Sequence, residues 1–309
     1  MRGVRSGPLI HVAGNSVLDM LVRDAPVDGW SGNTVYFLKQ PVDGVPGGNG
    51  GSTAYLLGRL GERVSLNTQV GMDSLGIMVR GWFDDAGITL VGPPARTTAV
   101  NVVMLGPGGE PRWVYYTGEK VVWRRSLDAS GAEWIFAPGY AQVTSEDLRE
   151  LVEVFEAFGS RGAKVVFDPG PWFFATVTRE EMLHAWRHVD CLIGTEEELS
   201  TWHSYKAVEA LVEGLLDQGP KQVVVKRGGE GAAFGGIDEE IASLPTEQVG
   251  GANTVGAGDT FNAGVLHGLC RGETLEKAVK IGLRLATQAV KQGRGVLGAL
   301  EEKSSNGVN

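Results

Sequence analysis

Short, uninterrupted apolar runs alternate with helical patterns along most of this 309-residue chain. Residues 9–13 (LIHVA), 164–168 (KVVFD) and 222–226 (QVVVK) are typical of strands that are buried on both faces. Such an alternation predicts a parallel sheet with helices on both sides. The expected fold class is therefore α/β, with three layers and a doubly wound, mainly parallel sheet.

The same patterns place the remaining elements. The helix at 144–159 is expected to begin with a Thr144-x-x-Asp147 capping box. Further strands are expected at 64–70, 134–139 and 190–193. Further helices are expected at 52–61, 73–87, 256–271 and 274–291.

Two segments depart from this alternation. Residues 17–48 show no helical period, and residues 96–117 alternate around a GPGG turn as a β-hairpin does. We expect the two segments to form a small antiparallel sheet that acts as a β lid over the site. The length suits one large domain, so residues 1–309 are expected to be a single domain that carries this lid.

The charge and the cysteines limit the partners and the compartment. A formal net charge of -9 argues against a nucleic-acid or anionic-membrane partner. No apolar run is long enough to span a membrane. Cys191 and Cys270 have no CxxC spacing and are interpreted as reduced thiols, so we expect a cytoplasmic protein.

The most specific local feature is NTVGAGDTFNAG at 253–264. Small residues at the start of a helix let an anion approach the unpaired N–H groups and the positive end of the helix dipole. Asp259 beside them could take a hydroxyl proton while the backbone holds a transferred phosphoryl group. The alternative interpretation is a glycine-rich turn with an ordinary capping Asp.

Several other enzyme classes lack their motifs here. GAGDTF differs from the dinucleotide fingerprint because its sixth residue is Phe261 and because it lies late in the chain. The sequence contains no P-loop, no HExxH and no G-x-S-x-G. The five histidines show no spacing typical of zinc.

Residues 45–61 (VPGGNGGSTAYLLGRLG), 70–76 (VGMDSLG) and 253–264 together resemble the successive signatures of the ribokinase-like (PfkB-type) carbohydrate kinases. Their order and spacing match over nearly the whole chain. The resemblance implies an ATP-dependent kinase that phosphorylates a hydroxyl, expected to be primary, of a small sugar or sugar acid. Two alternatives stay open: a nucleoside kinase on the same fold, and a non-catalytic sugar-binding member of the family.

The resemblance also implies roles for single residues. Asp259 would be the general base, and the anion hole would be the backbone of Gly256, Ala257 and Gly258. The residues that would bind the substrate are Asp19, Gly47, Gly48 and Asn49. A surface or turn carboxylate at 19 and a plain turn residue at 49 are the alternative interpretations.

On the nucleotide side the resemblance implies that Lys226, Gly228 and Gly231 lie along ATP. Glu198 would organise Mg²⁺ through water, and Thr195 stands where relatives often have Asn. A solvated lysine at a strand end and a negatively charged helix start are the alternative interpretations here.

Three departures from the family pattern suggest a branch apart from the well-known ribokinases. Asn253 replaces an Asp that helps to build a monovalent cation site, which argues against activation by potassium. Ser52 stands where an Asn usually precedes the helix. The segment Asp168-Pro169-Gly170-Pro171-Trp172 replaces an Asp-Pro-Asn-Arg run.

The lid segments are expected to select the substrate, because they close over it and exclude water. Arg96 and Arg112 could bind a carboxylate or phosphate, or be ordinary surface charges. Aromatic side chains in the lid could stack on a sugar or nucleobase, or pack lid against lid in a homodimer. The aromatic residues and one amide in these segments are Trp30, Tyr36, Phe37, Asn101, Trp113, Tyr115 and Tyr116.

Overall fold

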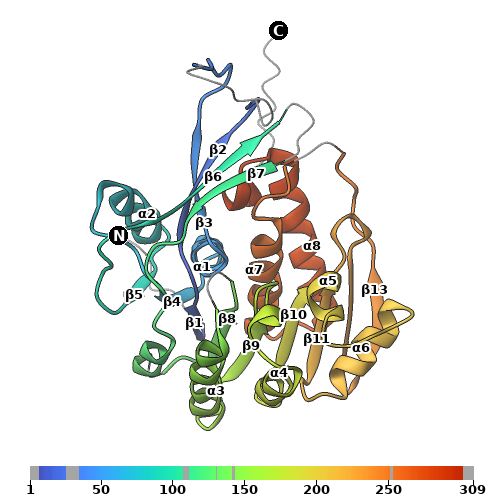
Figure 1. The fold of residues 1–309 in the computed structure, drawn as a ribbon. Helices are drawn as coiled ribbons and strands as arrows, with labels where there is room; N and C mark the ends of the chain where they lie inside the picture. Colours follow the sequence, from blue (N-terminus) through green and yellow to red (C-terminus); the bar gives the residue numbers. More distant parts are fainter. Residues whose placement is uncertain are drawn as a thin grey trace.

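The computed structural model describes residues 7–25, 35–106, 111–129, 131–140, 143–250 and 253–301. Within these ranges the main sheet has nine strands in the order β13–β12–β11–β10–β9–β8–β1–β4–β5 (Figure 1). The strands are β1 (Leu9–Ala13), β4 (Arg63–Asn67), β5 (Thr89–Val91), β8 (Trp134–Pro138), β9 (Lys164–Asp168), β10 (Cys191–Thr195), β11 (Gln222–Lys226), β12 (Ala232–Gly236) and β13 (Glu239–Leu244). Neighbouring strands are parallel except for β11–β12 and β12–β13, so the sheet is mainly parallel, as expected.

A second, four-stranded sheet has the order β3–β2–β6–β7. It consists of β2 (Val17–Val22), β3 (Asp43–Gly47), β6 (Ala99–Leu105) and β7 (Pro111–Tyr116), which come from the two segments expected to form the lid. The β2–β3 and β6–β7 pairs are antiparallel, whereas β2 and β6 are parallel. Trp30 lies outside the described residues.

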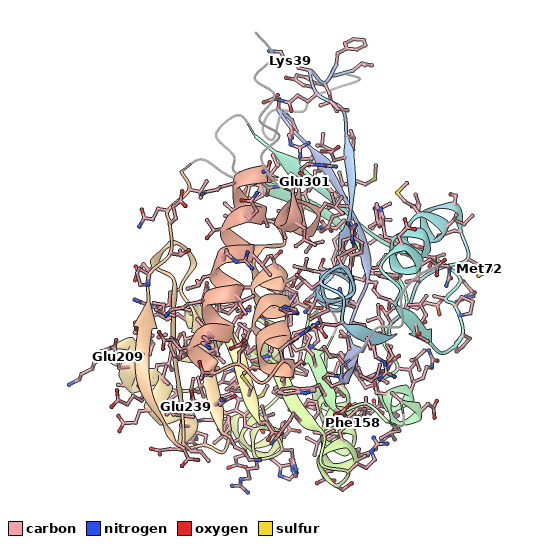
Figure 2. The ribbon with its side chains drawn as sticks, turned by 180° about the vertical axis from the view of Figure 1, so that it is seen from behind. Lys39, Met72, Phe158, Glu209, Glu239 and Glu301 are labelled. Atoms are coloured by element: carbon pink, nitrogen blue, oxygen red, sulfur yellow. The ribbon has the colours of Figure 1, made fainter. Side chains whose placement is uncertain are left out.

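Helices cover both faces of the main sheet and complete the three layers. The helices are α1 (Asn49–Arg59), α2 (Ser74–Asp85), α3 (Ser145–Gly159), α4 (Arg179–Trp186), α5 (Glu196–Ser200), α6 (Val208–Leu216), α7 (Ala257–Cys270) and α8 (Leu275–Gln292). One buried cluster joins the sheet to α1, α2, α7 and α8, and a second joins it to α3, α4, α5 and α6. Figure 2 views the face covered by α7 and α8, with the lid projecting above it toward Lys39.

The helix beginning at 256–257 and the capping box at Thr144 and Asp147 agree with the sequence expectations. Helix α1, by contrast, begins at Asn49 and not at 52, so Ser52 lies inside its first turn. The reason is close packing, because a Cβ on Gly50 would lie 2.6 Å from the carbonyl carbon of Gly14. Among the described residues, no helix is both long and apolar enough to cross a membrane.

Candidate active site

Three neighbouring strands deliver polar or charged side chains to one edge of the main sheet. Asp168 ends β9, Thr195 ends β10 just before α5, and Lys226 ends β11. The carboxyl ends of parallel strands share an edge, where open α/β sheets bind their ligands. The signature at 253–264 contributes the start of α7 to this same region, as the contacts of Lys226 demonstrate.

Lys226 is a buried cation. Its Nζ donates to Asp168 Oδ2 at 2.8 Å and to Asn262 Oδ1 at 3.4 Å. Asn262 Nδ2 donates to the same Asp168 oxygen at 2.7 Å. The side chain of Lys226 is only 11% exposed, so the interpretation of a solvated strand-end lysine is wrong. Burial alone would lower the pKa of Lys226, but the carboxylates of Asp168 and Glu198 outweigh it and raise this pKa.

The start of α7 lies beside this ammonium. Gly256 is its N-cap, with a left-handed φ of 77°. A Cβ on Gly258 would lie 4.0 Å from Lys226 Nζ. The first N–H groups of a helix have no acceptor within the helix. An anion bound to them would therefore also be close to the charge of Lys226.

Asp259 stands in the first turn of α7. Burial raises the pKa of its carboxyl to about 7; Lys226 lowers this pKa, and Asp168 and Asp19 raise it further. A hydrogen bond from Ser52 lowers it as well. The Ser52 hydroxyl has a single proton, which it can donate instead to the carbonyl oxygen of Pro46 at 3.1 Å. The departure at position 52 thus leaves a hydroxyl beside the candidate base.

The lid contributes a row of polar side chains. Asp19 on β2, Asn101 on β6 and Tyr115 on β7 are directly paired in register, so they share one face of the lid sheet. Asn101 Nδ2 donates to Asp19 Oδ1 at 3.1 Å, and Asn15 Nδ2 donates to the Tyr115 hydroxyl at 3.1 Å. Burial raises the pKa of Asp19 to about 6, although Asn101 opposes this shift. The interpretation of Asp19 as a surface carboxylate is wrong, since the residue is 8% exposed.

The glycine pair before α1 adjoins this row. A Cβ on Gly47 would lie 2.3 Å from Asp19 Cγ, so any larger residue would displace the carboxylate. Gly48 is the N-cap of α1, and Asn49 is the first residue of that helix. Asn49 Oδ1 accepts from Gly50 N at 2.9 Å.

Three buried amide atoms in this region have no hydrogen-bond partner in the described part of the chain. They are Asn15 Oδ1, Asn49 Nδ2 and Asn101 Oδ1. Buried polar atoms are nearly always paired, so a group of three points to a polar ligand that completes them. Their donor and acceptor character suits the hydroxyls of a small polyol.

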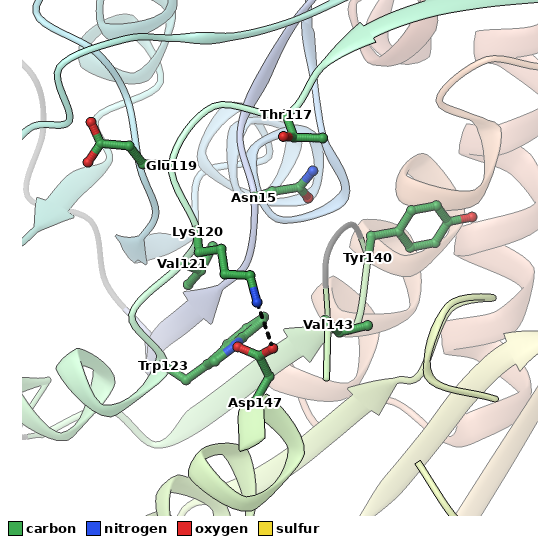
Figure 3. Close-up of a pocket in the computed structure, with 9 residues that line it drawn as sticks. All are labelled: Asn15, Thr117, Glu119, Lys120, Val121, Trp123, Tyr140, Val143 and Asp147. Carbon is green, nitrogen blue, oxygen red and sulfur yellow. Dashed lines mark hydrogen bonds and ion pairs between the residues drawn. The ribbon is translucent and has the colours of Figure 1, made fainter. Parts of the chain in front are cut away.

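A small pocket continues from this region. Asn15 and Tyr140 both line it, and Lys120 contacts Asp147 at 3.5 Å on its wall (Figure 3). The Tyr140 hydroxyl donates to Glu198 Oε1 at 3.4 Å. Asn15 and Tyr140 were not candidates from the sequence, because each belongs to a short loop after a strand with no motif of its own.

Glu198 lies in the first turn of α5. Its Oε2 accepts from Thr195 N at 2.7 Å, while the Thr195 hydroxyl accepts from Glu198 N at 3.1 Å. The replacement of Asn by Thr at 195 therefore preserves a helix cap. Burial and Asp168 raise the pKa of Glu198, and Lys226 opposes the shift.

Asp168, Glu198 and Asp259 thus surround a single ammonium, Lys226. This excess of carboxylates over cations, with two of the carboxylates buried, suits a divalent cation with phosphate groups. The residues present therefore fit the Mg²⁺ that the family resemblance implies.

The segment after β11 forms a tight turn. Gly228 and Gly231 have positive φ angles of 54° and 95°. A Cβ on Gly231 would lie 1.9 Å from Leu244 O, which excludes other residues. Arg227 next to them donates to Glu196 Oε2 at 2.9 Å. The structure places this turn beside α5, at the same edge as Lys226.

The loop before α7 is fixed by a different network. Asn253 Oδ1 accepts from Val255 N at 3.0 Å, and Asn253 Nδ2 donates to Gly293 O at 3.4 Å. Arg23 Nη2 donates to the same carbonyl at 3.0 Å, and Arg23 Nη1 donates to Asp43 Oδ2 at 2.8 Å. A guanidinium and an amide N–H repel a cation, so these residues do not fit the monovalent cation site that the family pattern implies.

Comparison with known proteins identifies the family. The sequence profile of the pfkB family carbohydrate kinases matches residues 24–301. The chain belongs to this family. As a pfkB kinase it is a phosphotransferase, and its relatives act on sugars or nucleosides.

The kinase is 26% identical over 262 residues to ribokinase from Bacillus subtilis (strain 168), which covers 80% of this chain and 81% of that protein. It is 30% identical over 165 residues to 2-dehydro-3-deoxygluconokinase from Escherichia coli (strain K12), with 50% and 52% covered. The structure of adenosine kinase from Sinorhizobium meliloti superposes with a TM-score of 0.78 at 19% identity, covering 95% of this chain and 98% of that one. That likeness shows the ribokinase-like fold.

Proposed function

We propose that this kinase transfers the γ-phosphoryl group of ATP to a primary hydroxyl of a small sugar or sugar acid. The observation that carries the proposal is the position of Asp259. Its pKa is raised to about 7, it lies in the first turn of α7, and the buried ammonium of Lys226 is beside that turn. A base with a pKa near the working pH is the most effective proton acceptor.

In the proposed reaction, an Asp259 oxygen takes the proton of the acceptor hydroxyl. The hydroxyl oxygen forms a bond to the γ-phosphorus, and the bond from that phosphorus to the bridging oxygen of ADP breaks. The N–H groups of Gly256, Ala257 and Gly258, together with Lys226, stabilise the negative charge on the transferred group. Asp19 and Asn49 hold the sugar, and Asn101 completes its hydroxyl contacts.

ATP would lie along the turn that contains Gly228 and Gly231, with its phosphates toward Lys226. Mg²⁺, when bound, would neutralise the phosphates, and Glu198 would hold it through water. Thr195 would act indirectly, because its hydroxyl already caps α5. We also infer that the whole chain acts as one catalytic domain with the β2–β3–β6–β7 sheet as its lid.

The competing substrate class is a nucleoside. Tyr115 is 40% exposed and Trp113 is 59% exposed on β7, so either ring is available to stack on a base. The unpaired amide atoms of Asn15, Asn49 and Asn101 favour the sugar, because they match several hydroxyls at close range. The non-catalytic alternative is set aside, since the carboxylates, the ammonium and the helix start are all present.

The test of the substrate is a panel of acceptors with Mg²⁺ and ATP, measured by ADP release. Ribose, fructose, 2-keto-3-deoxygluconate, adenosine and pseudouridine represent the competing classes. We expect kcat/KM to be highest for one of the sugars or for the sugar acid. A preference for a nucleoside would favour the nucleoside-kinase alternative over the proposal. If none of the acceptors on the panel leads to ADP release, both are contradicted.

The test of the mechanism is Asp259→Asn. Removal of a general base costs about 10²–10⁴ in rate, so we expect kcat to fall by that range. Nucleotide binding, followed by calorimetry with ADP, should stay within a few-fold. Asp238→Asn, in the turn between β12 and β13, serves as the control. A variant at 259 with unaltered kcat would remove Asp259 from the reaction.

A further inference from the structure

A second cluster of ligating side chains lies at the end of the molecule away from the lid. Glu156 is on α3, His184 is in the last turn of α4, and His188 follows in the turn after that helix. Figure 1 shows α3 and α4 near each other at the lower end of the molecule. The cluster is therefore at the opposite edge of the sheet from the candidate active site, because β9 and β10 begin at the edge beside the cluster and end at the edge that holds the candidate active site.

The three side chains face one another. His188 Nε2 lies 3.5 Å from Glu156 Oε1. The rings of His184 and His188 meet edge to face, with centroids 5.3 Å apart. One ligand atom from each residue lies within 4.8 Å of the corresponding atoms of the other two. Small rotamer changes would bring all three within bonding distance of one ion.

The donor set determines the class of ion. Two imidazoles and a carboxylate are the ligands of Zn²⁺ and other borderline cations such as Co²⁺ and Ni²⁺. Mg²⁺ and Ca²⁺ prefer sets made of oxygen alone, and two imidazoles do not supply one. The expectation that the histidines show no spacing typical of zinc is wrong for His184 and His188, which lie four residues apart as H-x₃-H. The third ligand, Glu156, comes from a helix about 30 residues earlier in the chain, and only the fold brings it to the pair.

The surroundings leave room for further ligands. Glu156 and His188 border a hollow of about 380 Å³, which Lys164, Arg187 and Lys221 also line. Asp190 in that hollow already binds both lysines, at 3.4 and 2.8 Å. Three protein ligands beside an open hollow would leave a coordination position for water.

We propose that Glu156, His184 and His188 form a binding site for one borderline divalent cation, of which Zn²⁺ is the best match. The site is separate from the candidate active site. Its failure would leave the proposed kinase reaction untouched, and failure of that reaction would leave the site intact.

The test uses the full chain, without a histidine tag and freed of metal by a chelator. Titration with Zn²⁺ in a calorimeter should give one site per chain, and Co²⁺ should produce visible absorption bands. The double variant His184→Ala/His188→Ala should lose the site. Glu156→Gln, which preserves the shape of the side chain, should weaken Zn²⁺ binding by about tenfold or more, because it removes one of three ligands.

His203→Ala is the matched control, because it removes a histidine outside the cluster and should bind Zn²⁺ like the unaltered protein. Zn²⁺ should also raise the Tm of the unaltered chain and not that of the double variant, since a ligand stabilises only the state that binds it. An equal Zn²⁺ affinity in the double variant would overturn the proposal. So would the absence of stoichiometric binding in the unaltered chain.

Discussion

At the scale of single residues, the site is governed by one buried cation and the carboxylates around it. Lys226 bonds Asp168 directly and faces the helix start that bears Asp259. Its charge lowers the pKa of Asp259 against the effect of burial. The Lys226 ammonium can therefore stabilise the folded chain when no phosphate is bound, and it can stabilise charge on the phosphoryl group when ATP is bound.

Replacing Lys226 should show how much its charge stabilises the fold against the repulsion of the surrounding carboxylates. We expect Lys226→Met to lower the free energy of unfolding by about 3–5 kcal/mol, because a buried charge loses its partner. Urea unfolding at pH 7.5 measures the effect. Lys221→Met, at an exposed ion pair near the other end of β11, should change it by less than about 1 kcal/mol. Equal losses in the two variants would contradict the assigned role.

The pKa of Asp259 predicts a pH profile. The base must be ionised, so kcat/KM should rise with pH through an apparent pKa of about 7 and level off above it. In Asp259→Asn this rise should disappear from the residual rate. Initial rates with saturating Mg²⁺ and ATP between pH 5.5 and 9 check it. A flat profile in the unaltered kinase would contradict the raised pKa.

The same group predicts the direction of a stability effect. Its pKa is raised from 3.8 to about 7 on folding, so the folded state holds a proton that the unfolded chain has lost in between. Its stabilising contribution is complete below pH 3.8 and is lost as pH rises through 7. Asp259→Asn should therefore raise Tm relative to the unaltered chain more at pH 8 than at pH 5, as calorimetric scans can show.

The sequence could nominate Asp259 and its glycines because they form one continuous motif. It could not reveal the row of Asp19, Asn101 and Tyr115. Asp19 and Asn101 are 82 residues apart, and only the register of β2 against β6 brings them together. No local sequence pattern sets that register. The pairing of Lys226 with Asp168 could not be predicted for the same reason, because it joins the ends of two different strands.

At the scale of elements, the lid and the start of α7 are joined through Arg23. This side chain links Asp43 on β3 to Gly293 O, which also accepts from Asn253. Val255 in the same loop packs against the apolar lid cluster that contains Leu21 and Val45. The backbone that would form the anion hole is therefore held by the base of the lid.

Arg23→Gln should loosen this connection without removing a group from the reacting atoms. A hydrogen bond from a charged donor contributes about 1.5–3 kcal/mol, so we expect kcat to fall by about tenfold or more. Lys39→Gln, a loss of charge at the far end of the lid, is the control. Steady-state kinetics with Tm as a check on folding decide it; an unaltered kcat would mean that the contact does not position the loop.

The elements themselves were predictable in proportion to their apolar character. β9 and β11 are largely apolar runs, and the bounds that the sequence predicts for them agree with the structure at both ends. β13 is mostly polar and partly exposed, and the sequence pattern does not predict it. The sequence pattern predicts the start of α1 at 52 and not at Asn49, because the residues before and within its first turn include glycines, which are poor helix formers. Tertiary packing against Gly14 outweighs that propensity.

At the scale of the whole molecule, β7 is an edge strand with an exposed apolar surface. Val114 is 59% exposed and Tyr116 is 54% exposed, although apolar edge strands are usually covered or charged. We propose that a second copy of the kinase covers this edge, lid against lid. Light scattering after size exclusion should then give about twice the chain mass of 32.9 kDa.

Val114→Lys should convert such a dimer to a monomer, because it places a charge in the apolar contact. Ile237→Lys, at a similarly exposed apolar position in the turn after β12, should remain dimeric. A monomeric mass for the unaltered chain at tens of micromolar would rule the arrangement out.

The polar row on the lid has a consequence for how such enzymes diversify. The groups that would handle phosphate come from the strand ends of the main sheet and from α7, whereas Asn101 and Tyr115 come from β6 and β7. Substitutions on β6 and β7 can therefore change which alcohol substrate is bound, while the residues proposed to transfer the phosphoryl group stay the same.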